Sequence, residues 1–321
     1  LNCFKMVKKS KNDIEILKGY QNKKSSVHGL ENFFNHLYQI KKFGTLPFAH
    51  LARAGFVAMI FLKTAVSEKL ISSDEENNFM YSLNTVSGEL VIDAIAVNQG
   101  TFSRKDFINK YGHLRPGTYD INSNRYADDI ERFIDPVLKQ YSSYKVKDNK
   151  PFSFSTKSKK NLTTALKNIG LSIEFDVFER FLRDAIEGRE YSKFVFSKSL
   201  SSGIEELKNW ASSLQISIEH ASCISLEDLS LIRMGQKQAH LSTWLDAHVK
   251  TENEMRLLSN SIELPQLITS EEDFYGFSTP PSDPNFIGVG KVTAKIVNLD
   301  DCNEKKLEGS VVLITHADPG Y

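Results

Sequence analysis

The chain has 321 residues, of which 40% are hydrophobic and 25% charged, and its 40 basic and 40 acidic residues cancel to a net charge of +0. These values are ordinary for a globular protein of about two domains. They argue against binding to nucleic acid through an overall basic excess, so no nucleic acid is expected as a partner.

The longest apolar stretch lies within residues 51–70, where Arg53 and Lys63 interrupt it. A membrane span needs about 20 predominantly apolar residues, so this stretch predicts a buried helix, and no membrane is expected as a partner. The three cysteines lie far apart and form no CxxC pair. This pattern indicates reduced thiols and a cytoplasmic location.

Helical patterns dominate the first part of the chain. Apolar residues recur at helical spacing over 30–40. Pro47 stands where the first turn of a long helix over 48–70 would tolerate it. Ser103 and Asp106 have the spacing of a capping box and predict the start of a helix.

Further helices are predicted in the second half of the chain. Residues 156–170 present one apolar face and end in a glycine, and a strong apolar stripe with a related continuation covers 175–207. Ser225 with Asp228 predicts the opening of another helix, which carries apolar residues as far as Leu245.

The character of the sequence changes near Leu264-Pro265, and from Ser278 prolines gather in a stretch typical of a linker or a domain edge. Beyond it, residues 292–296 alternate as in a strand, and residues 310–315 form a short apolar run of the kind found in buried strands. We therefore expect a mainly α protein with a helical domain over 1–278 and the first strands of a second domain over 279–321.

The most unusual segment is Tyr111-Gly-His-Leu-Arg-Pro-Gly-Thr-Tyr-Asp120, which follows a predicted helix that Gly112 is placed to end. Its glycines and proline can hold His113 and Arg115 in fixed directions. A guanidinium is suited to carboxylate or phosphate, so Arg115 is a candidate for substrate binding. The alternative is an Arg115–Asp120 ion pair that only locks the loop.

Asp128, Asp129 and Asp135 invite comparison with the DDxxD magnesium motif of helical terpenoid synthases. The third carboxylate stands at the wrong spacing for that motif. Magnesium is usually held by one or two carboxylates together with phosphates, so an acidic pair is weak support for a metal site. The start of a solvated helix, where the dipole favours acidic residues, is the simpler interpretation.

Two separated stretches carry a resemblance to a known family. Residues 111–126, from Tyr-Gly-His-Leu-Arg-Pro-Gly-Thr-Tyr-Asp to Asn-Ser-Asn-Arg-Tyr, resemble the YGHRGP-type segment of phosphoenolpyruvate synthase and rifampin phosphotransferase relatives, above all those found with capsule genes. Residues 285–321, which end in Thr-His-Ala-Asp-Pro-Gly-Tyr, resemble the opening of the family's swivelling phosphohistidine domain. Arg189-Glu190, Lys193-Phe194 and Lys198 also resemble the helical region between them.

The resemblance implies a phosphotransferase of the ATP- or phosphoenolpyruvate-dependent kind. In such an enzyme an upstream ATP-grasp domain, with ATP and Mg²⁺ as cofactors, phosphorylates a histidine, and the histidine domain then serves a second site where a small-molecule acceptor binds. By the same resemblance, His113, Arg115, Asp120 and Arg125 are the expected substrate-binding residues. Leu114 stands where many relatives carry arginine, and Thr118 where many carry glutamate.

The family's phosphohistidine follows a Gly-Gly-x-x-Ser-His motif that would lie downstream of Tyr321. We therefore expect the chain to be an internal fragment with no catalytic residue and no bound metal or nucleotide of its own, inactive by itself. The alternative is a non-catalytic helical binding or scaffold module. A third class, a metal-dependent diphosphate lyase, fails on the aspartate spacing described above.

Overall fold

The computed structural model describes residues 2–23, 25–116, 119–144, 152–236, 241–260, 262, 268, 270–276, 292–298, 307 and 309–313. Its contacts divide the chain into two compact units, Leu1–Ser222 and Cys223–Pro319. The chain is mainly helical, as the sequence predicts. The predicted change of domain near residue 278 lies outside the described residues.

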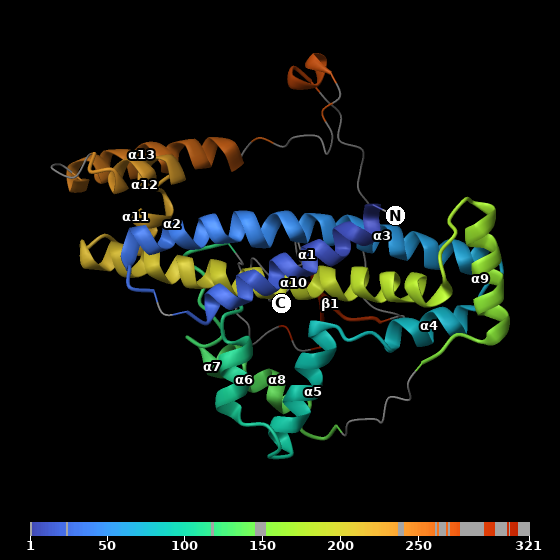
Figure 1. The fold of residues 1–321 in the computed structure, drawn as a ribbon. Coiled ribbons are helices and arrows are strands. Elements are labelled where there is room, and N and C mark those ends of the chain that lie inside the picture. The colour runs from blue at the N-terminus through green and yellow to red at the C-terminus, as the bar shows by residue number, and fades with distance from the viewer. Residues whose placement is uncertain are drawn as a thin grey trace. The chain divides into compact units, whose positions relative to one another are not determined.

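The first unit is built from helices of very different length (Figure 1). In chain order they are α1 (Asn2–Gln21), α2 (Gly29–Ile40), the π-helix η1 (Lys41–Thr45), α3 (Leu46–Ser67), α4 (Ser73–Tyr81), α5 (Val86–Asn98), α6 (Arg104–Tyr111), α7 (Ile130–Phe133), α8 (Asp135–Gln140), α9 (Thr156–Asn168), α10 (Phe175–Ser213) and α11 (Ile218–Ser222).

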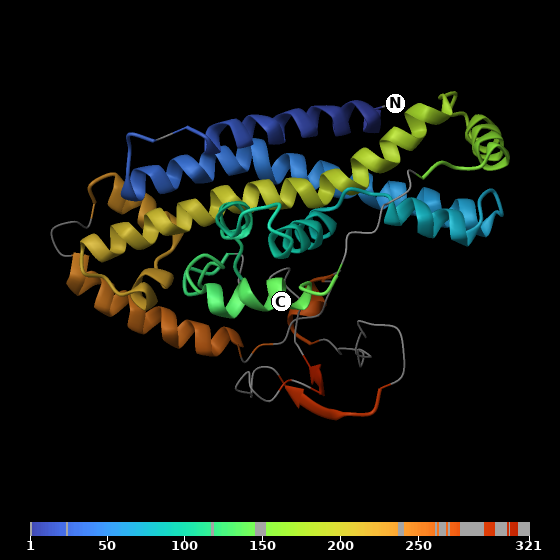
Figure 2. The same ribbon diagram turned by 90° about the horizontal axis from the view of Figure 1, so that it is seen from below.

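The 39-residue helix α10 is the centre of this unit. It joins the two predicted apolar stripes into one helix, and α1, α2 and α3 run alongside it in both views (Figures 1 and 2). Phe178, Phe181, Leu182 and Phe196 of α10 are at most 4% exposed and form the main core with residues of α1 and α3. Gly188 lets α3 approach closely, because a Cβ there would lie 3.1 Å from a methyl carbon of Leu51.

Helices α2 and α3 form one continuous helical run through η1, and Pro47 stands in the first turn of α3, as predicted. The backbone of Thr45 is already helical, and the wider π-turn of η1 precedes the proline. Gly44 within that turn packs against α10, where a Cβ would stand 2.8 Å from the Cβ of Phe196. Gly44, like Gly188, therefore lets this helical run and α10 approach closely.

The predicted buried helix over 51–70 is α3, which ends at Ser67 and is buried on one face only. Leu51, Ala54, Ala58 and Leu62 pack in the main core, whereas Phe56 and Ile60 are 58% and 64% exposed. By length and composition alone the run Gly29–Ser67 could span a membrane, a test that the core helix of a soluble protein also passes.

A second, smaller core lies between α5, α6 and α8. Phe107 and Tyr111 of α6 are almost fully buried there. The predicted cap of α6 is confirmed, because the Ser103 hydroxyl accepts a hydrogen bond from the backbone N–H of Asp106. Gly112 ends the helix as predicted. This core fixes the direction in which the chain leaves α6.

The predicted helix over 156–170 is α9, capped by Ser155 and ended by Gly170 at a positive φ of 82°. One carboxylate joins its start to that of α4. Glu75 accepts from the backbone N–H of Ser72 in a capping box, and also from the backbone N–H of Ser155 and the hydroxyl of Ser158. Burial raises the pKa of Glu75, but these hydrogen bonds outweigh it and leave the pKa below its ordinary value.

The second unit contains α12 (Leu226–Arg233), α13 (Leu241–Asn260), the 3₁₀ helix η3 (Glu271–Phe274), β1 (Lys295–Asn298) and β2 (Ser310–Leu313). The Ser225 cap is confirmed, but the single helix predicted through Leu245 is wrong. Gly235, at a φ of 86°, follows the end of α12, and a separate helix begins at Leu241.

Strands β1 and β2 pair in parallel, with Lys295 opposite Ser310 and Asn298 opposite Leu313. Both predicted strands are therefore present, although β1 begins at Lys295 and leaves Val292 and Ala294 outside it. The proline-rich segment predicted as a linker lies outside the described residues.

Candidate functional site

The loop from Gly112 to Asp129 connects α6 to α7 and contains the predicted substrate-binding residues. Glycine is required at its start, because a Cβ on Gly112 would lie 2.4 Å from the carbonyl oxygen of Ile108 and 2.9 Å from the Cβ of Ala127. The two arms of the loop are joined by backbone hydrogen bonds from Tyr126 to Leu114 (2.8 Å) and from Ala127 to Gly112 (3.0 Å).

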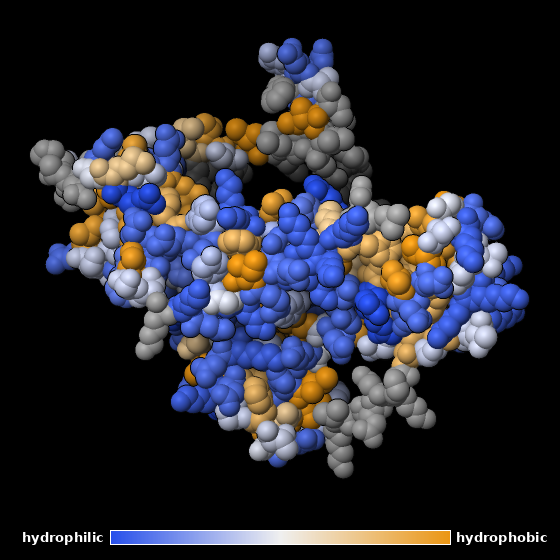
Figure 3. Space-filling view, viewed as in Figure 1, coloured by the Kyte–Doolittle hydropathy of each residue, from blue (hydrophilic) through white to orange (hydrophobic). Residues whose placement is uncertain are grey.

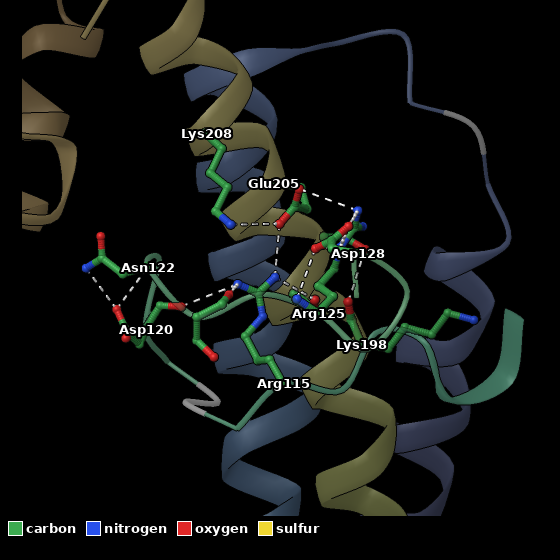
Figure 4. A network of polar contacts seen from close by, with 11 residues as sticks. Arg115, Asp120, Asn122, Arg125, Asp128, Lys198, Glu205 and Lys208 are labelled. Carbon is green, nitrogen blue, oxygen red and sulfur yellow. Dashed lines mark hydrogen bonds and ion pairs between the residues drawn. The ribbon is translucent and has the colours of Figure 1, made fainter. Parts of the chain in front are cut away.

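Arg115 anchors this loop to α10 from inside the protein, with 3% of its surface exposed. One terminal nitrogen, Nη1, donates to the backbone carbonyls of Asp120 (3.4 Å) and Ser123 (3.0 Å). The other, Nη2, donates to Ser201 Oγ and Glu205 Oε1 of α10, both at 3.0 Å (Figure 4). The guanidinium fork therefore links two points of the loop to two positions on one face of a helix.

Glu205 is the centre of a cluster that we define as Arg115, Arg125, Asp128, Glu205 and Lys208. The Glu205 carboxylate lies 3.0 Å from Arg115, 3.6 Å from Arg125 and 3.6 Å from Lys208. Arg125 also grips the Asp128 carboxylate with Nε and Nη2 at 2.7 to 3.2 Å. Three cations thus face two carboxylates, which leaves the Glu205 cluster with an excess positive charge (Figure 4).

The pKa values in the cluster follow from these pairs. The hydrogen bonds with Asp128 raise the pKa of Arg125, and those with Arg125 lower the pKa of Asp128. Burial lowers the pKa of Arg115, which the hydrogen bond to Glu205 partly offsets. An arginine remains protonated throughout the physiological range, so Arg115 and Arg125 both carry their charge.

The expected ion pair between Arg115 and Asp120 is not formed. The Asp120 carboxylate instead accepts from the backbone N–H and the side-chain amide of Asn122, at 2.9 and 3.2 Å, and only the Asp120 carbonyl oxygen meets Arg115. Asp120 therefore shapes a turn of its own. The idea that Arg115 locks the loop holds, but its carboxylate partner is Glu205.

His113, near the start of the loop, has its ring edge-on to Phe194 of α10, at 4.8 Å between ring centres. Burial, together with the charges of Lys198 and Arg115, lowers its pKa to about 4, while the nearby carbonyls of Phe194 and Lys110 act in the opposite direction. Neither ring nitrogen makes a hydrogen bond within the described residues. His113 is therefore a neutral packing residue at pH 7, outside the Glu205 cluster.

Arg125 is the predicted cationic site residue that is exposed enough for an anionic ligand to reach. Its side chain is 33% exposed, and its Nη1 makes no hydrogen bond within the described part of the chain. Lys208 beside it is 14% exposed. The ammonium of Lys198, by contrast, points away from Glu205 (Figure 4).

Asp128, Asp129 and Asp135 each make a separate contact and do not form a joint site. Asp128 pairs with Arg125, Asp129 caps α7, and Asp135 pairs with Arg104 at 2.6 Å. Among the described residues no group of three histidine, cysteine or acidic side chains could hold a metal ion. The helix-start interpretation of Asp129 is thus confirmed.

Sequence reasoning missed the α10 half of the cluster, namely Ser201, Glu205 and Lys208. The signal is present, because these residues recur at i, i+4 and i+7 within a helix whose neighbouring positions are apolar. Such a polar row beside a core stripe marks the face that meets a polar partner. No protein-family profile, curated protein or solved structure matches the chain.

Proposed function

We propose that the first unit is the acceptor-binding helical domain of an ATP- or phosphoenolpyruvate-dependent phosphotransferase, and that the Glu205 cluster binds the anionic group of its substrate. In this proposal the phosphohistidine domain and the ATP-grasp domain belong to the same parent protein, ATP and Mg²⁺ are bound by the latter, and the enzyme is cytoplasmic. The acceptor is a small molecule.

The observation that carries the proposal is the meeting of two stretches that resemble the same family but are far apart in sequence. The ring of Phe194 lies 4.8 Å from that of His113 and 5.8 Å from that of Tyr111. Further along, Arg115 and Arg125 of the loop contact Glu205 of α10 in the Glu205 cluster. If each segment resembled the family only by chance, there would be no reason for the two segments to lie side by side.

The charge of the cluster also supports an anionic ligand. Arg125 retains a free donor at the surface, and the cations outnumber the carboxylates around Glu205. A carboxylate or phosphate placed against Arg125 and Lys208 would bring the local charge toward balance. Phosphoryl transfer depends mainly on such positioning and on charge neutralisation.

The parallel strands β1 and β2 are compatible with the opening of a swivelling β/α domain, which we propose for residues 279–321. Parallel strands need a crossover connection, and α/β domains are built from such units. In the parent enzyme this domain would bring its phosphohistidine to the acceptor, which divides one difficult transfer into two easier ones.

The second candidate is a non-catalytic helical scaffold, and one observation favours it. Both terminal nitrogens of Arg115 are occupied by protein oxygens, and the residue is buried. In a scaffold the whole cluster would act only as a latch between the loop and α10. The two candidates differ in the role of Arg125, which binds the ligand in the phosphotransferase and only pairs with Asp128 and Glu205 in the scaffold.

Calorimetric titration with phosphoenolpyruvate separates them. We expect saturable 1:1 binding that is weakened about tenfold or more by Arg125→Gln, which removes a charge and its fork. Arg53→Gln, an exposed arginine on α3, is the matched control and should bind as the parent chain does. The absence of binding, or equal affinity in the two variants, would favour the scaffold.

A further inference from the structure

A cleft separate from the Glu205 cluster opens between the first turns of α1 and of α10. Its volume is 430 Å³, which falls in the range of roughly 300–1,000 Å³ that small-molecule sites occupy. Figure 3 shows hydrophobic surface, in orange, beside the N-terminal half of α1 among hydrophilic residues in blue. The cleft thus has the size of a ligand site in a part of the unit that the proposed function does not use.

The floor of the cleft is apolar and partly aromatic. Phe4 and Phe181 stack at 4.4 Å between ring centres with their planes tilted by 33°, and Val7 lies beside them. Phe181 and Val7 are 4% and 3% exposed, so they belong to the main core and form a fixed base. Val177 on the α10 side is 45% exposed and provides an apolar wall.

The rim of the cleft is basic. Lys8, Lys11 and Arg180 line it together with a single carboxylate, Asp184. Lys11 and Asp184 neutralise each other in an ion pair with 2.5 Å between Nζ and Oδ1. Lys8 and Arg180 are exposed and make no ion pair within the described residues. Two cations from different helices therefore remain uncompensated above an apolar floor.

We infer that this cleft binds a free organic anion with an apolar body, of the fatty-acid class. The floor would hold the hydrocarbon, and Lys8 and Arg180 would hold the carboxylate from opposite sides. A hydrocarbon chain would cover the exposed parts of Phe4 and Val177, and a carboxylate would be attracted by Lys8 and Arg180. This inference is independent of the proposed phosphotransferase function.

Displacement of the fluorescent sulfonate 8-anilinonaphthalene-1-sulfonate by laurate tests the inference on the whole chain. We expect saturable 1:1 binding of laurate, weakened about tenfold or more when Lys8→Glu and Arg180→Glu are combined, because attraction at the rim becomes repulsion. Lys160→Glu, at an exposed lysine of α9, is the control for a charge reversal and should leave the affinity unchanged.

A second variant fills the cleft from its wall on the α10 side without changing the charges of the rim. Val177→Trp places a large side chain into the cleft from an exposed position, so the fold should persist, as thermal unfolding can verify, while laurate binding is lost. Equal laurate affinity in the rim variant and in Lys160→Glu would overturn the inference. Association with phosphatidylglycerol vesicles without affinity for laurate in solution would also overturn it and identify a membrane surface as the ligand.

Discussion

The role of Arg115 follows from the groups that it contacts and not from its side-chain chemistry alone. The sequence marks it as a fork for an anion, and the fork is used, but for Ser201 and Glu205 of α10 and for two loop carbonyls. A buried guanidinium that loses its carboxylate, or a carboxylate that loses its guanidinium, is left without compensation for its desolvation. The strength of this latch is therefore a measurable property of the fold.

The Arg115–Glu205 pair should contribute strongly to stability. We expect Arg115→Ala to lower the free energy of unfolding by about 3 kcal/mol, the size of the loss when one partner of a buried pair is removed. Urea unfolding of the single and double variants should reveal coupling between Arg115 and Glu205 and none between the Arg115 and Asp120 side chains. Arg104→Ala, which breaks a largely exposed pair with Asp135, should cost less than about 1 kcal/mol.

His113 should make the stability depend on pH. Its folded pKa of about 4 lies below its ordinary value of about 6.5, so between these values the unfolded chain binds more protons and stability falls as the pH falls. We expect His113 to account for a loss of about 1 kcal/mol between pH 7.5 and 5.5. In His113→Leu this part should vanish, whereas His28→Leu, at an exposed histidine, should retain it. Identical pH profiles in the two variants would contradict the assignment.

Among the helices, the sequence predicts those ends that depend on residues close by in the chain. The caps at Ser103 and Ser225 and the glycine ends of α6 and α9 depend on neighbouring backbone groups, and the helices begin and end there. The union of α2, η1 and α3 could not be predicted in this way. Pro47 is compatible with both a first turn and a helix that continues after a π-turn, and contact with α10 decides between them.

The glycine in that π-turn provides a test of the packing. Gly44→Ala should destabilise the protein by about 1 to 3 kcal/mol, because its Cβ would lie 2.8 Å from the Cβ of Phe196 and force the helices apart. Gly19→Ala is the matched control within α1, where a Cβ meets nothing within 4 Å. It should stabilise the protein by up to about 1 kcal/mol through helix propensity. Denaturant unfolding that moved both variants in the same direction would rule out the close approach.

For the whole molecule, the sequence predicted the mainly helical class, because helical periodicity is strong over long segments. It also predicted strands after residue 292, from an alternating run and a short apolar run. It also selected the loop that packs on α10. It could not identify Glu205 and Lys208 as partners of that loop, since such pairs depend on how distant segments meet. Because the proposal assigns the phosphohistidine to another part of the parent enzyme, we expect this chain by itself not to be phosphorylated.

The chain incubated with γ-labelled ATP or with labelled phosphoenolpyruvate should form no acid-labile, base-stable phosphoenzyme. The physical reason is that the proposed phosphohistidine belongs to a motif absent from these 321 residues. Base-stable label can be measured after denaturing filtration, with a histidine kinase of known labelling as the positive control. Stoichiometric label on any of the eight histidines would require a different mechanism.

We propose above that the loop and α10 together form an anion site at the Glu205 cluster. Hydrogen exchange, followed by mass spectrometry with and without phosphoenolpyruvate, tests it most directly. We expect slower exchange in peptides that contain Arg125 and in those that cover 198–208, with no change in α9. Unchanged exchange at saturating ligand, or protection confined to other helices, would contradict it.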